Sequence, residues 1–260
     1  MQLGLNEKVL LITGGAKGIG EAISMGAADE GAIPVIVDRD ADACERVQSE
    51  LEKINKRSLC ICCDLCVADE CRRAVATTLK EFGTIDGLVN NAGLNDRVGL
   101  EHGDPEQFVQ SLSRNLFHYY NMAHFALPAL KQAKGSIVNV ASKTAVTGQG
   151  GTSGYAASKG AILALTREWA VELLACEIRV NAVVPAEVMT PLYKNWLATF
   201  PEPEEKLRLI HSKIPLGNRM TRPEEIASMV LFLLSTRAQH VTGQHVFVDG
   251  GYVHLDRSVS

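Results

Sequence analysis

Tyr155 and Lys159 stand four residues apart, and Ser142 lies thirteen residues before the tyrosine, at the end of an apolar run. A phenol with a pKa near ~10 is almost entirely protonated at neutral pH. Positions i and i+4 share one face of a helix, so a lysine there can place its ammonium beside the phenol and favour the phenolate. Lowering the pKa by ~3 units requires roughly 4 kcal/mol, which we expect one lysine and a cationic cofactor ring to supply together. The three residues therefore predict a site that moves a proton on or off a substrate oxygen.

The length and composition of the chain indicate one soluble globular domain. Its 260 residues suit a single α/β domain over residues 1–260, and its 46% hydrophobic and 22% charged residues are ordinary globular values. A formal net charge of -4 without a basic run argues against nucleic acid or an anionic membrane as the main partner. No apolar stretch approaches the ~20 residues that span a bilayer. Because the seven cysteines come without an export signal, we expect a cytoplasmic protein.

Five cysteines cluster between Cys60 and Cys71. Cys63 and Cys66 have the spacing of half a zinc site, but no second Cys-x-x-Cys and no histidine nearby in sequence complete it. The residues from Cys60 to Cys62 fit a buried strand, in which cysteine behaves as a small apolar residue. We therefore expect no metal site, and a metal or redox role stays the minor alternative.

Short apolar runs alternate with helix-length amphipathic stretches from end to end. The apolar runs are 9–13, 33–37, 59–63, 85–90, 136–140, 178–184 and 245–248. The stretches between them are 18–30, 40–53, 68–82, 105–130, 153–175 and 223–234. Continuously apolar strands separated by helices predict an α/β fold, a Rossmann-type doubly wound parallel sheet in a single domain. After the sixth strand, residues 186–216 exceed an ordinary connection, which predicts a substrate-loop insertion.

The first predicted strand runs directly into a glycine-rich turn, Thr13–Gly20, that opens a helix. Glycines allow the backbone to approach a pyrophosphate, whose charge is met by the first amides of that helix. The spacing Gly14-x-x-x-Gly18-x-Gly20 has one more residue in the turn than Gly-x-Gly-x-x-Gly. We expect Gly14, Lys17, Gly18 and Ile19 to contact a dinucleotide cofactor, with a purely structural turn as the alternative.

Asp38 ends the second predicted strand, about twenty residues after the glycines, where an acidic residue meets the ribose hydroxyls of NAD. The same carboxylate would repel the 2'-phosphate of NADP by roughly 4 kcal/mol at ~4 Å near the surface. Arg39 beside it could offset part of that repulsion. We expect NAD as the cofactor, and the alternative role for Asp38 is to cap the next helix.

Two further strand ends carry small or polar residues. Asp64 and Leu65 follow the third strand, where an adenine contact and a simple turn are both open. Asn91, Ala92 and Gly93 follow the fourth strand and suit a chain that packs tightly against a cofactor, although turn chemistry alone would also explain the amide.

In combination these segments resemble the short-chain dehydrogenase/reductase family. The matching segments are Thr13–Gly20, Asp64, Asn90–Gly93, Asn115, Ser142, Tyr155 with Lys159, and Pro185–Thr190. They follow one another in the order of the family over nearly the whole chain. The resemblance implies one Rossmann-type domain with a parallel sheet. It also implies assembly as a homotetramer, or a dimer, through helices at about 105–130 and 153–175.

The same resemblance implies the roles of the chemical residues. Tyr155 is the general acid/base, and Lys159 lowers its pKa and holds the nicotinamide ribose. Ser142 hydrogen-bonds the substrate oxygen, and Asn115 holds a water that links Lys159 to solvent. A structural amide within the helix is the alternative for Asn115.

After the sixth strand the resemblance places Pro185 and Val188 against the cofactor, with the Val188 backbone on the nicotinamide carboxamide and the Thr190 hydroxyl beside it. One departure stands out. The family usually has Pro-Gly here, whereas this chain has Pro185-Ala186, which removes backbone freedom from the substrate loop.

Polar residues on the loops and the insertion predict a pocket for a small hydroxyl-rich molecule. The candidate substrate contacts are Asn95, Gln149, Glu187, Asn195 and Trp196, together with Ser142 and Tyr155. Amides and a carboxylate beside an indole suit a sugar, whose hydroxyls are oriented by hydrogen bonds while its ring packs on the aromatic. The charged run 202–208 indicates that the insertion is not an apolar lid. The alternative is that these charges only solvate an outer helix face.

The stretches 185–193 and 247–256 resemble the bacterial L-fucose dehydrogenases, a group within the family. That likeness implies NAD-dependent oxidation of an aldose at the anomeric carbon to a lactone. The alternatives are another alcohol or ketone oxidoreductase of the family, of hydroxysteroid or 3-ketoacyl type, and a non-catalytic dinucleotide sensor. The tail residues Tyr252, His254, Asp256 and Arg257 either reach the pocket of a neighbouring subunit or pack on their own.

Overall fold

The structure is a computed structural model that describes residues 2–54 and 56–255. Within those residues, seven parallel strands form one sheet in the order β3-β2-β1-β4-β5-β6-β7. The strands are β1 Val9–Thr13, β2 Ile33–Asp38, β3 Leu59–Cys62, β4 Gly87–Asn90, β5 Ser136–Val140, β6 Arg179–Pro185 and β7 His245–Val248. This confirms the predicted single-domain, doubly wound α/β fold, with strand limits that differ from the apolar runs by at most two residues.

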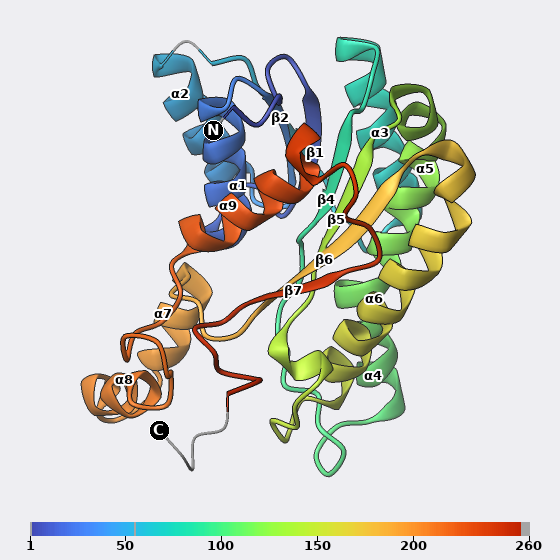
Figure 1. Ribbon diagram of the computed structural model, residues 1–260. Coiled ribbons are helices and arrows are strands. Elements are labelled where there is room, and N and C mark those ends of the chain that lie inside the picture. Colours follow the sequence, from blue (N-terminus) through green and yellow to red (C-terminus); the bar gives the residue numbers. More distant parts are fainter. Residues whose placement is uncertain (1, 55, 256–260) are drawn as a thin grey trace.

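Helices cover both faces of the sheet (Figure 1). They are α1 Gly18–Asp29, α2 Ala41–Lys53, α3 Ala68–Phe82, α4 Pro105–Leu112, α5 His118–Ala133, α6 Ser153–Glu172, α7 Pro191–Leu197, α8 Pro203–His211 and α9 Pro223–Leu234. Helices α1 and α9 lie on one face, and α3, α5 and α6 lie on the other. Local signals set the helix ends: the Asp40 carboxylate caps the start of α2, and Gly83, at a φ of 74°, ends α3 in the left-handed region.

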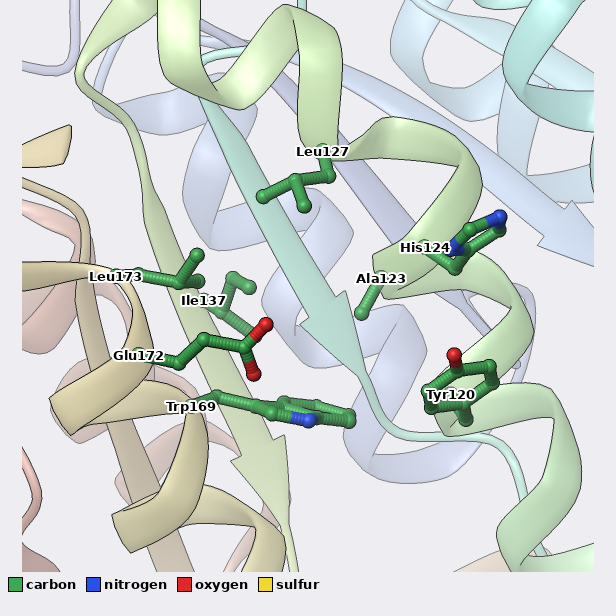
Figure 2. A pocket seen from close by; sticks show the side chains of 8 residues that line it. All are labelled: Tyr120, Ala123, His124, Leu127, Ile137, Trp169, Glu172 and Leu173. Carbon is green, nitrogen blue, oxygen red and sulfur yellow. The ribbon is translucent and has the colours of Figure 1, made fainter.

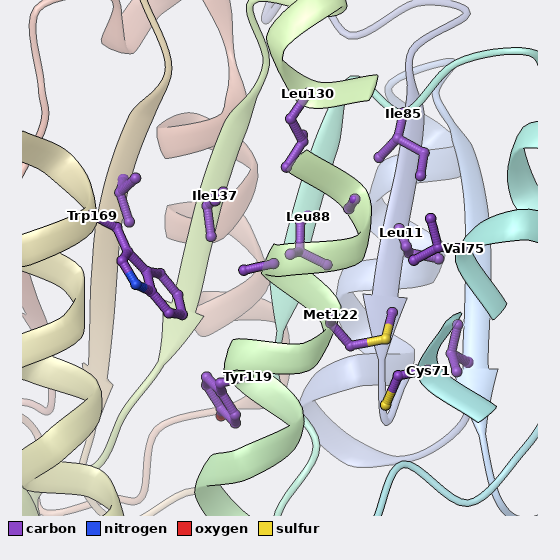
Figure 3. Packing of buried hydrophobic residues seen from close by; sticks show 14 of the residues in the cluster. Leu11, Cys71, Val75, Ile85, Leu88, Tyr119, Met122, Leu130, Ile137 and Trp169 are labelled. Carbon is purple, nitrogen blue, oxygen red and sulfur yellow. The ribbon is translucent and has the colours of Figure 1, made fainter. Parts of the chain in front are cut away.

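Alternation along the strands sends side chains into two main cores. Leu10 and Ile12 of β1 pack with α1 and α9, whereas Leu11 packs with α3 and α5. Figure 3 shows the second core, in which Met122 and Leu130 of α5 lie over the sheet. Because both faces are covered, β1 and β5 are buried along their whole length, which explains their continuously apolar sequences.

The outer faces of α5 and α6 border a pocket (Figure 2). It is lined by Tyr120, Ala123, His124, Leu127, Ile137, Trp169, Glu172 and Leu173. Within the described residues, no helix is long and apolar enough to cross a membrane.

The strand order reverses between β1 and β4, which both lie at the centre of the sheet. In an open parallel sheet the crevice for a ligand opens at the carboxyl ends of the strands flanking this switch point. The glycine turn follows β1, and the segment Asn91–Gly93 follows β4, so both flank that crevice. The insertion after β6 folds into α7 and α8, which stand apart from the helices that cover the sheet (Figure 1).

Candidate active site

Ser142, Tyr155 and Lys159 meet at the carboxyl edge of the sheet. Ser142 follows β5, and its hydroxyl accepts a hydrogen bond from the Thr144 amide at 3.3 Å. Tyr155 and Lys159 lie in the first two turns of α6, as their spacing predicts. The Ser142 side chain lowers the pKa of Tyr155, so the two hydroxyl groups lie near each other. A serine and a tyrosine hydroxyl near each other can bind the same substrate oxygen.

Lys159 is held by other partners than Tyr155 in this structure. Its Nζ donates to Tyr119 Oη at 3.0 Å and to the Val140 carbonyl at 2.8 Å, and it lies 5.6 Å from the centroid of the Tyr155 ring. Burial lowers the pKa of Lys159 to about 7. Burial also raises the pKa of Tyr155, against the opposing effect of the Ser142 side chain. The pKa of Tyr155 in the chain alone is therefore shifted upward, because desolvation outweighs the effect of Ser142, and the effect of Lys159 and a cofactor ring on that pKa stays a prediction.

Asn115 lies in a π-helical turn, Ser113–Phe117, between α4 and α5. The helical segment predicted over 105–130 is present, and this π turn lies within it between α4 and α5. Asn115 is fully buried; its Oδ1 accepts from the Leu94 amide at 2.7 Å and its Nδ2 donates to the Ser111 carbonyl at 3.0 Å. π-Bulges are frequent at functional sites.

Gly93 lies close to both the Asn115 side chain and the Lys159 ammonium. A Cβ at Gly93 would lie 2.9 Å from Asn115 Oδ1 and 3.7 Å from Lys159 Nζ. The fold therefore brings Asn115 and Lys159 to the same glycine, where a larger residue would crowd the Asn115 amide.

The glycine turn packs against the segment after β4. Gly14, at a φ of 61°, has no room for a side chain, because a Cβ would lie 2.9 Å from Ala92 Cα. A Cβ at Gly20 would overlap the Gly14 carbonyl oxygen. Gly18 faces the insertion, since its Cβ would lie 3.2 Å from Thr190 Cβ. The turn thus places Gly14 next to Ala92, which follows β4, and Gly18 next to Thr190, which follows β6.

Asn91 organises this turn through its side chain. Its Nδ2 donates to the Thr13 carbonyl at 2.9 Å and to the Gly14 carbonyl at 3.1 Å. The fully buried Thr13 hydroxyl accepts the amides of Asn91 at 2.9 Å and Ala92 at 3.2 Å. Both roles support the turn chemistry that the sequence left open for Asn91.

The start of α1 fits the pyrophosphate of a dinucleotide. Lys17 is the N-cap residue of α1, and its side chain makes no capping hydrogen bond, so the first amides of the helix have no side-chain acceptor. The Lys17 ammonium instead forms an ion pair with Asp40. Ile19 packs against the core that α1 and α9 share.

Asp38 lies where a ribose is expected. Its Oδ2 accepts the Ala16 amide at 3.2 Å and its Oδ1 accepts the Asp40 amide at 3.1 Å, so the carboxylate lies beside the glycine turn. The helix cap itself is Asp40, which accepts from the Ala43 amide. Capping therefore does not explain Asp38. Arg39 is exposed and borders a shallow hollow with residues 40–42.

The remaining cofactor candidates make contacts that stabilise turns, the core or helix ends. Asp64 Oδ1 accepts the Cys66 amide at 2.9 Å, an Asx turn, and the Leu65 side chain is buried in the core. Val188 is buried and pairs with Thr221 through a β-bridge. Thr190 caps α7 by accepting the Tyr193 amide at 3.2 Å. Pro185 is buried at the end of β6.

Among the substrate candidates, Glu187 has the most contacts. It forms an ion pair with Lys143 and accepts a hydrogen bond from Tyr193 Oη at 2.7 Å. Burial and that carboxylate raise the pKa of Tyr193. Trp196 packs edge-on against Tyr193, with ring centroids 5.0 Å apart, and against Phe200 at 4.9 Å. The insertion therefore carries an aromatic cluster joined to Glu187 through Tyr193.

Three candidates are not brought into this cluster. Asn95 Oδ1 accepts the Arg97 amide within its own loop. Gln149 and Asn195 are exposed, and in the described chain they share no hydrogen bond with the other predicted residues.

The cysteines and the tail have local partners. In the described part of the chain, no group of three or more His, Cys, Asp or Glu residues could hold a metal ion. The Tyr252 ring lies 4.1 Å from Lys143 Nζ, and the rings of His254 and Phe247 lie 4.3 Å apart. These tail residues pack on their own subunit, whereas Asp256 and Arg257 lie outside the described residues.

Sequence reasoning missed three residues at the site: Thr13, Tyr119 and Lys143. The sequence positions of two of them indicated that they lie near the site, because Lys143 directly follows Ser142 and Tyr119 lies one helical turn after Asn115. Thr13 was quoted as the start of the turn, but its hydroxyl received no role.

Comparisons with known proteins match nearly the whole chain. The model of the family described as enoyl-(acyl carrier protein) reductase matches residues 14–253. The 3-oxoacyl-[acyl-carrier-protein] reductase FabG of Thermotoga maritima is 36% identical over 250 residues, which cover 96% of this chain and 99% of that protein. The L-fucose dehydrogenase of Oryctolagus cuniculus is 35% identical over 245 residues, covering 94% and 84%. The crystal structure of Cj0485 dehydrogenase superposes with a TM-score of 0.94 at 45% identity, covering 99% and 98% of the two chains. The first two identities are nearly equal, so they do not single out a substrate.

Proposed function

The chain belongs to the short-chain dehydrogenase/reductase family, and from that premise we propose that it is an NAD-dependent dehydrogenase that oxidises an aldose, L-fucose or a similar sugar, at the anomeric carbon. The family and the fold imply a nicotinamide dinucleotide, which supplies the hydride acceptor when bound. The residues of the β1–α1 turn and Asp38 would hold it.

One observation carries the proposal. Ser142 follows β5 and lowers the pKa of Tyr155, with Lys159 on the same helix as Tyr155, at the sheet edge that also carries the glycine turn. In the proposed reaction the Tyr155 phenolate takes the proton of the anomeric hydroxyl while Ser142 donates a hydrogen bond to its oxygen. The electron pair that the broken O–H bond leaves on the oxygen forms the C=O bond of the lactone, and the C–H pair leaves as hydride, which a bound nicotinamide would accept. Because burial raises the pKa of Tyr155, we expect oxidation to accelerate as the pH rises toward the pKa of Lys159, about 7, above which loss of the lysine proton makes the rate level off.

Preference for NAD rests on Asp38. Its carboxylate is fixed beside the glycine turn by two backbone amides. A phosphate at the adjacent ribose hydroxyl would meet a like charge, at a cost of roughly 4 kcal/mol for ~4 Å near the surface. Arg39 is exposed and could offset part of that cost.

The sugar substrate is supported by the polar residues at the strand ends and by the L-fucose dehydrogenase relative. The equally similar 3-oxoacyl reductase favours a second candidate, the reduction of a 3-ketoacyl thioester. Formation of reduced nicotinamide across a panel of aldoses, polyols and hydroxysteroids, and its consumption with a 3-ketoacyl thioester, separates the candidates. Turnover of steroids or thioesters alone would remove the sugar proposal.

Tyr155→Phe tests the catalytic assignment itself. The variant retains the ring and loses the proton acceptor, so we expect cofactor binding within a factor of a few of the wild type and a loss of kcat of at least about 100-fold. Normal turnover with normal cofactor binding would refute the role of Tyr155 and bring back a non-catalytic sensor as a hypothesis.

We also propose that the protein is a homotetramer that uses α5 and α6 in one interface. Trp169 and Tyr120 line the pocket between them (Figure 2), and Tyr120 is 55% exposed. Val171, also on α6, is 70% exposed. Val171→Glu should reduce the assembly seen by light scattering after size-exclusion chromatography. An unchanged mass would place the interface elsewhere.

A further inference from the structure

Lys143 and Glu187 form a shielded ion pair beside Ser142. Their side chains are only 11% and 13% exposed. Tyr193 of α7 donates to the second carboxylate oxygen of Glu187 at 2.7 Å, and the Tyr252 ring lies 4.1 Å from Lys143 Nζ. Two opposite charges, one from each of two adjacent strand ends, thus lie between aromatic side chains.

The fold explains why these charges lie at the reacting end of the site. Strands β5, β6 and β7 are neighbours in the sheet, so their carboxyl ends lie at one edge. Lys143 follows Ser142 directly after β5, and Glu187 comes two residues after β6 ends. A backbone hydrogen bond from Thr221 to the Glu187 carbonyl, 2.9 Å long, fixes the start of the insertion. The pair is therefore positioned by the scaffold and not by a free loop.

The pair retains hydrogen-bonding capacity for one kind of ligand group. An ammonium has three donors and a carboxylate about four acceptor positions, and their mutual contact uses one of each. A hydroxyl can accept from Lys143 and donate to Glu187 at once. A ligand carboxylate would be repelled by Glu187, and an apolar ligand would remove water from both charges without replacing it.

We propose that the Lys143–Glu187 pair is a specificity-determining contact that binds a ring hydroxyl of the sugar next to the reacting carbon. This proposal rests on the proposed function and adds to it a residue, Lys143, that the sequence did not suggest. It also assigns the two charges one joint role, since removal of either one would leave the other without its partner in a shielded place.

A double-mutant cycle, with one change in the protein and the other in the substrate, tests the contact. The substrates are L-fucose and its monodeoxy analogues, each lacking one ring hydroxyl. The proteins are the wild type and Lys143→Met/Glu187→Gln, a double variant that leaves no unpaired charge. Lys194→Met removes an exposed lysine of α7 and is the matched control. Melting temperature and cofactor affinity are measured for each protein, so that loss of folding is recognised.

In the wild type we expect the absence of one particular hydroxyl to lower kcat/KM by about 10- to 100-fold. In the double variant the same deoxygenation should cost less than about threefold, because the ammonium is gone and a neutral amide binds the hydroxyl more weakly than a carboxylate does. The Lys194→Met control should keep the wild-type penalty.

Two results would overturn the proposal in distinguishable ways. If the double variant loses activity uniformly and keeps the wild-type penalty for every missing hydroxyl, the pair only supports the fold, and the proposed function survives. If the wild type oxidises neither L-fucose nor any other aldose, the proposed function fails, and this proposal fails with it.

Discussion

Replacing Tyr119 with phenylalanine removes one hydroxyl from the surroundings of Lys159. In the structure Lys159 Nζ donates to Tyr119 Oη at 3.0 Å and to the Val140 carbonyl at 2.8 Å. Burial already lowers the pKa of Lys159 to about 7. A hydrogen bond to a charged group contributes about 1.5–3 kcal/mol. At about 1.4 kcal/mol per unit, its loss lowers the pKa of Lys159 by a further one to two units, roughly.

The pH profile of sugar oxidation makes this shift visible. The reactive form has a protonated Lys159 and an ionised Tyr155, and the two groups titrate as a coupled pair. At a pH below the pKa of Lys159 in the variant, the lysine is protonated in both proteins. Their rates then rise together, because only the ionisation of Tyr155 limits them. Above that pKa the variant lysine loses its proton first. The kcat/KM of the variant should therefore level off at a pH about one to two units lower than in the wild type, at a value about 10- to 100-fold lower.

The assay measures kcat/KM for the sugar at saturating cofactor across the pH range. Tyr120→Phe is the matched control, because Tyr120 is the next residue of α5 and is 55% exposed. Its profile should follow the wild type. A Tyr119→Phe profile that levels off at the wild-type pH would refute the reasoning. A uniform fall at every pH would also refute it, since that pattern indicates a misplaced Lys159 rather than a changed pKa.

Four further substitutions have defined expectations. Asp38→Asn keeps an oxygen acceptor but removes the charge, so the kcat/KM ratio of NADP to NAD should rise at least about tenfold; an unchanged ratio would exclude Asp38 as the selector. Gly20→Ala sets a methyl group against the Gly14 carbonyl and should weaken cofactor binding at least about tenfold by calorimetry. Gly160→Ala, whose methyl would come no nearer than 4.0 Å to the atoms around it, should retain binding and add about 0.5–1 kcal/mol to the free energy of unfolding. Arg179→Met removes a guanidinium that donates at 2.6 Å and 3.3 Å to carbonyls ending α9, so chemical denaturation should show a loss of about 1.5–3 kcal/mol; no loss would mean that water replaces those bonds.

The sequence alone determined the order of the elements and the positions of the chemical residues along the chain. Continuous apolar runs appear because strands such as β1 are covered on both faces, and this pattern depends on local residue types. The Tyr155–Lys159 spacing and the Gly14–Gly20 turn are likewise local, so their placement on α6 and between β1 and α1 could be predicted.

Only the tertiary structure decided which partner each of these groups has. Lys159 lies against Tyr119, forty residues away in sequence, because the π turn at Asn115 and the packing of α5 against the sheet bring that hydroxyl to it. Lys143 meets Glu187 only because β5 and β6 are neighbours in the sheet. The pKa values of the buried Tyr155 and Lys159 also depend on desolvation by the assembled fold. Contacts between distant segments and the burial that follows from them are properties of the packed chain, which no local pattern of residues contains.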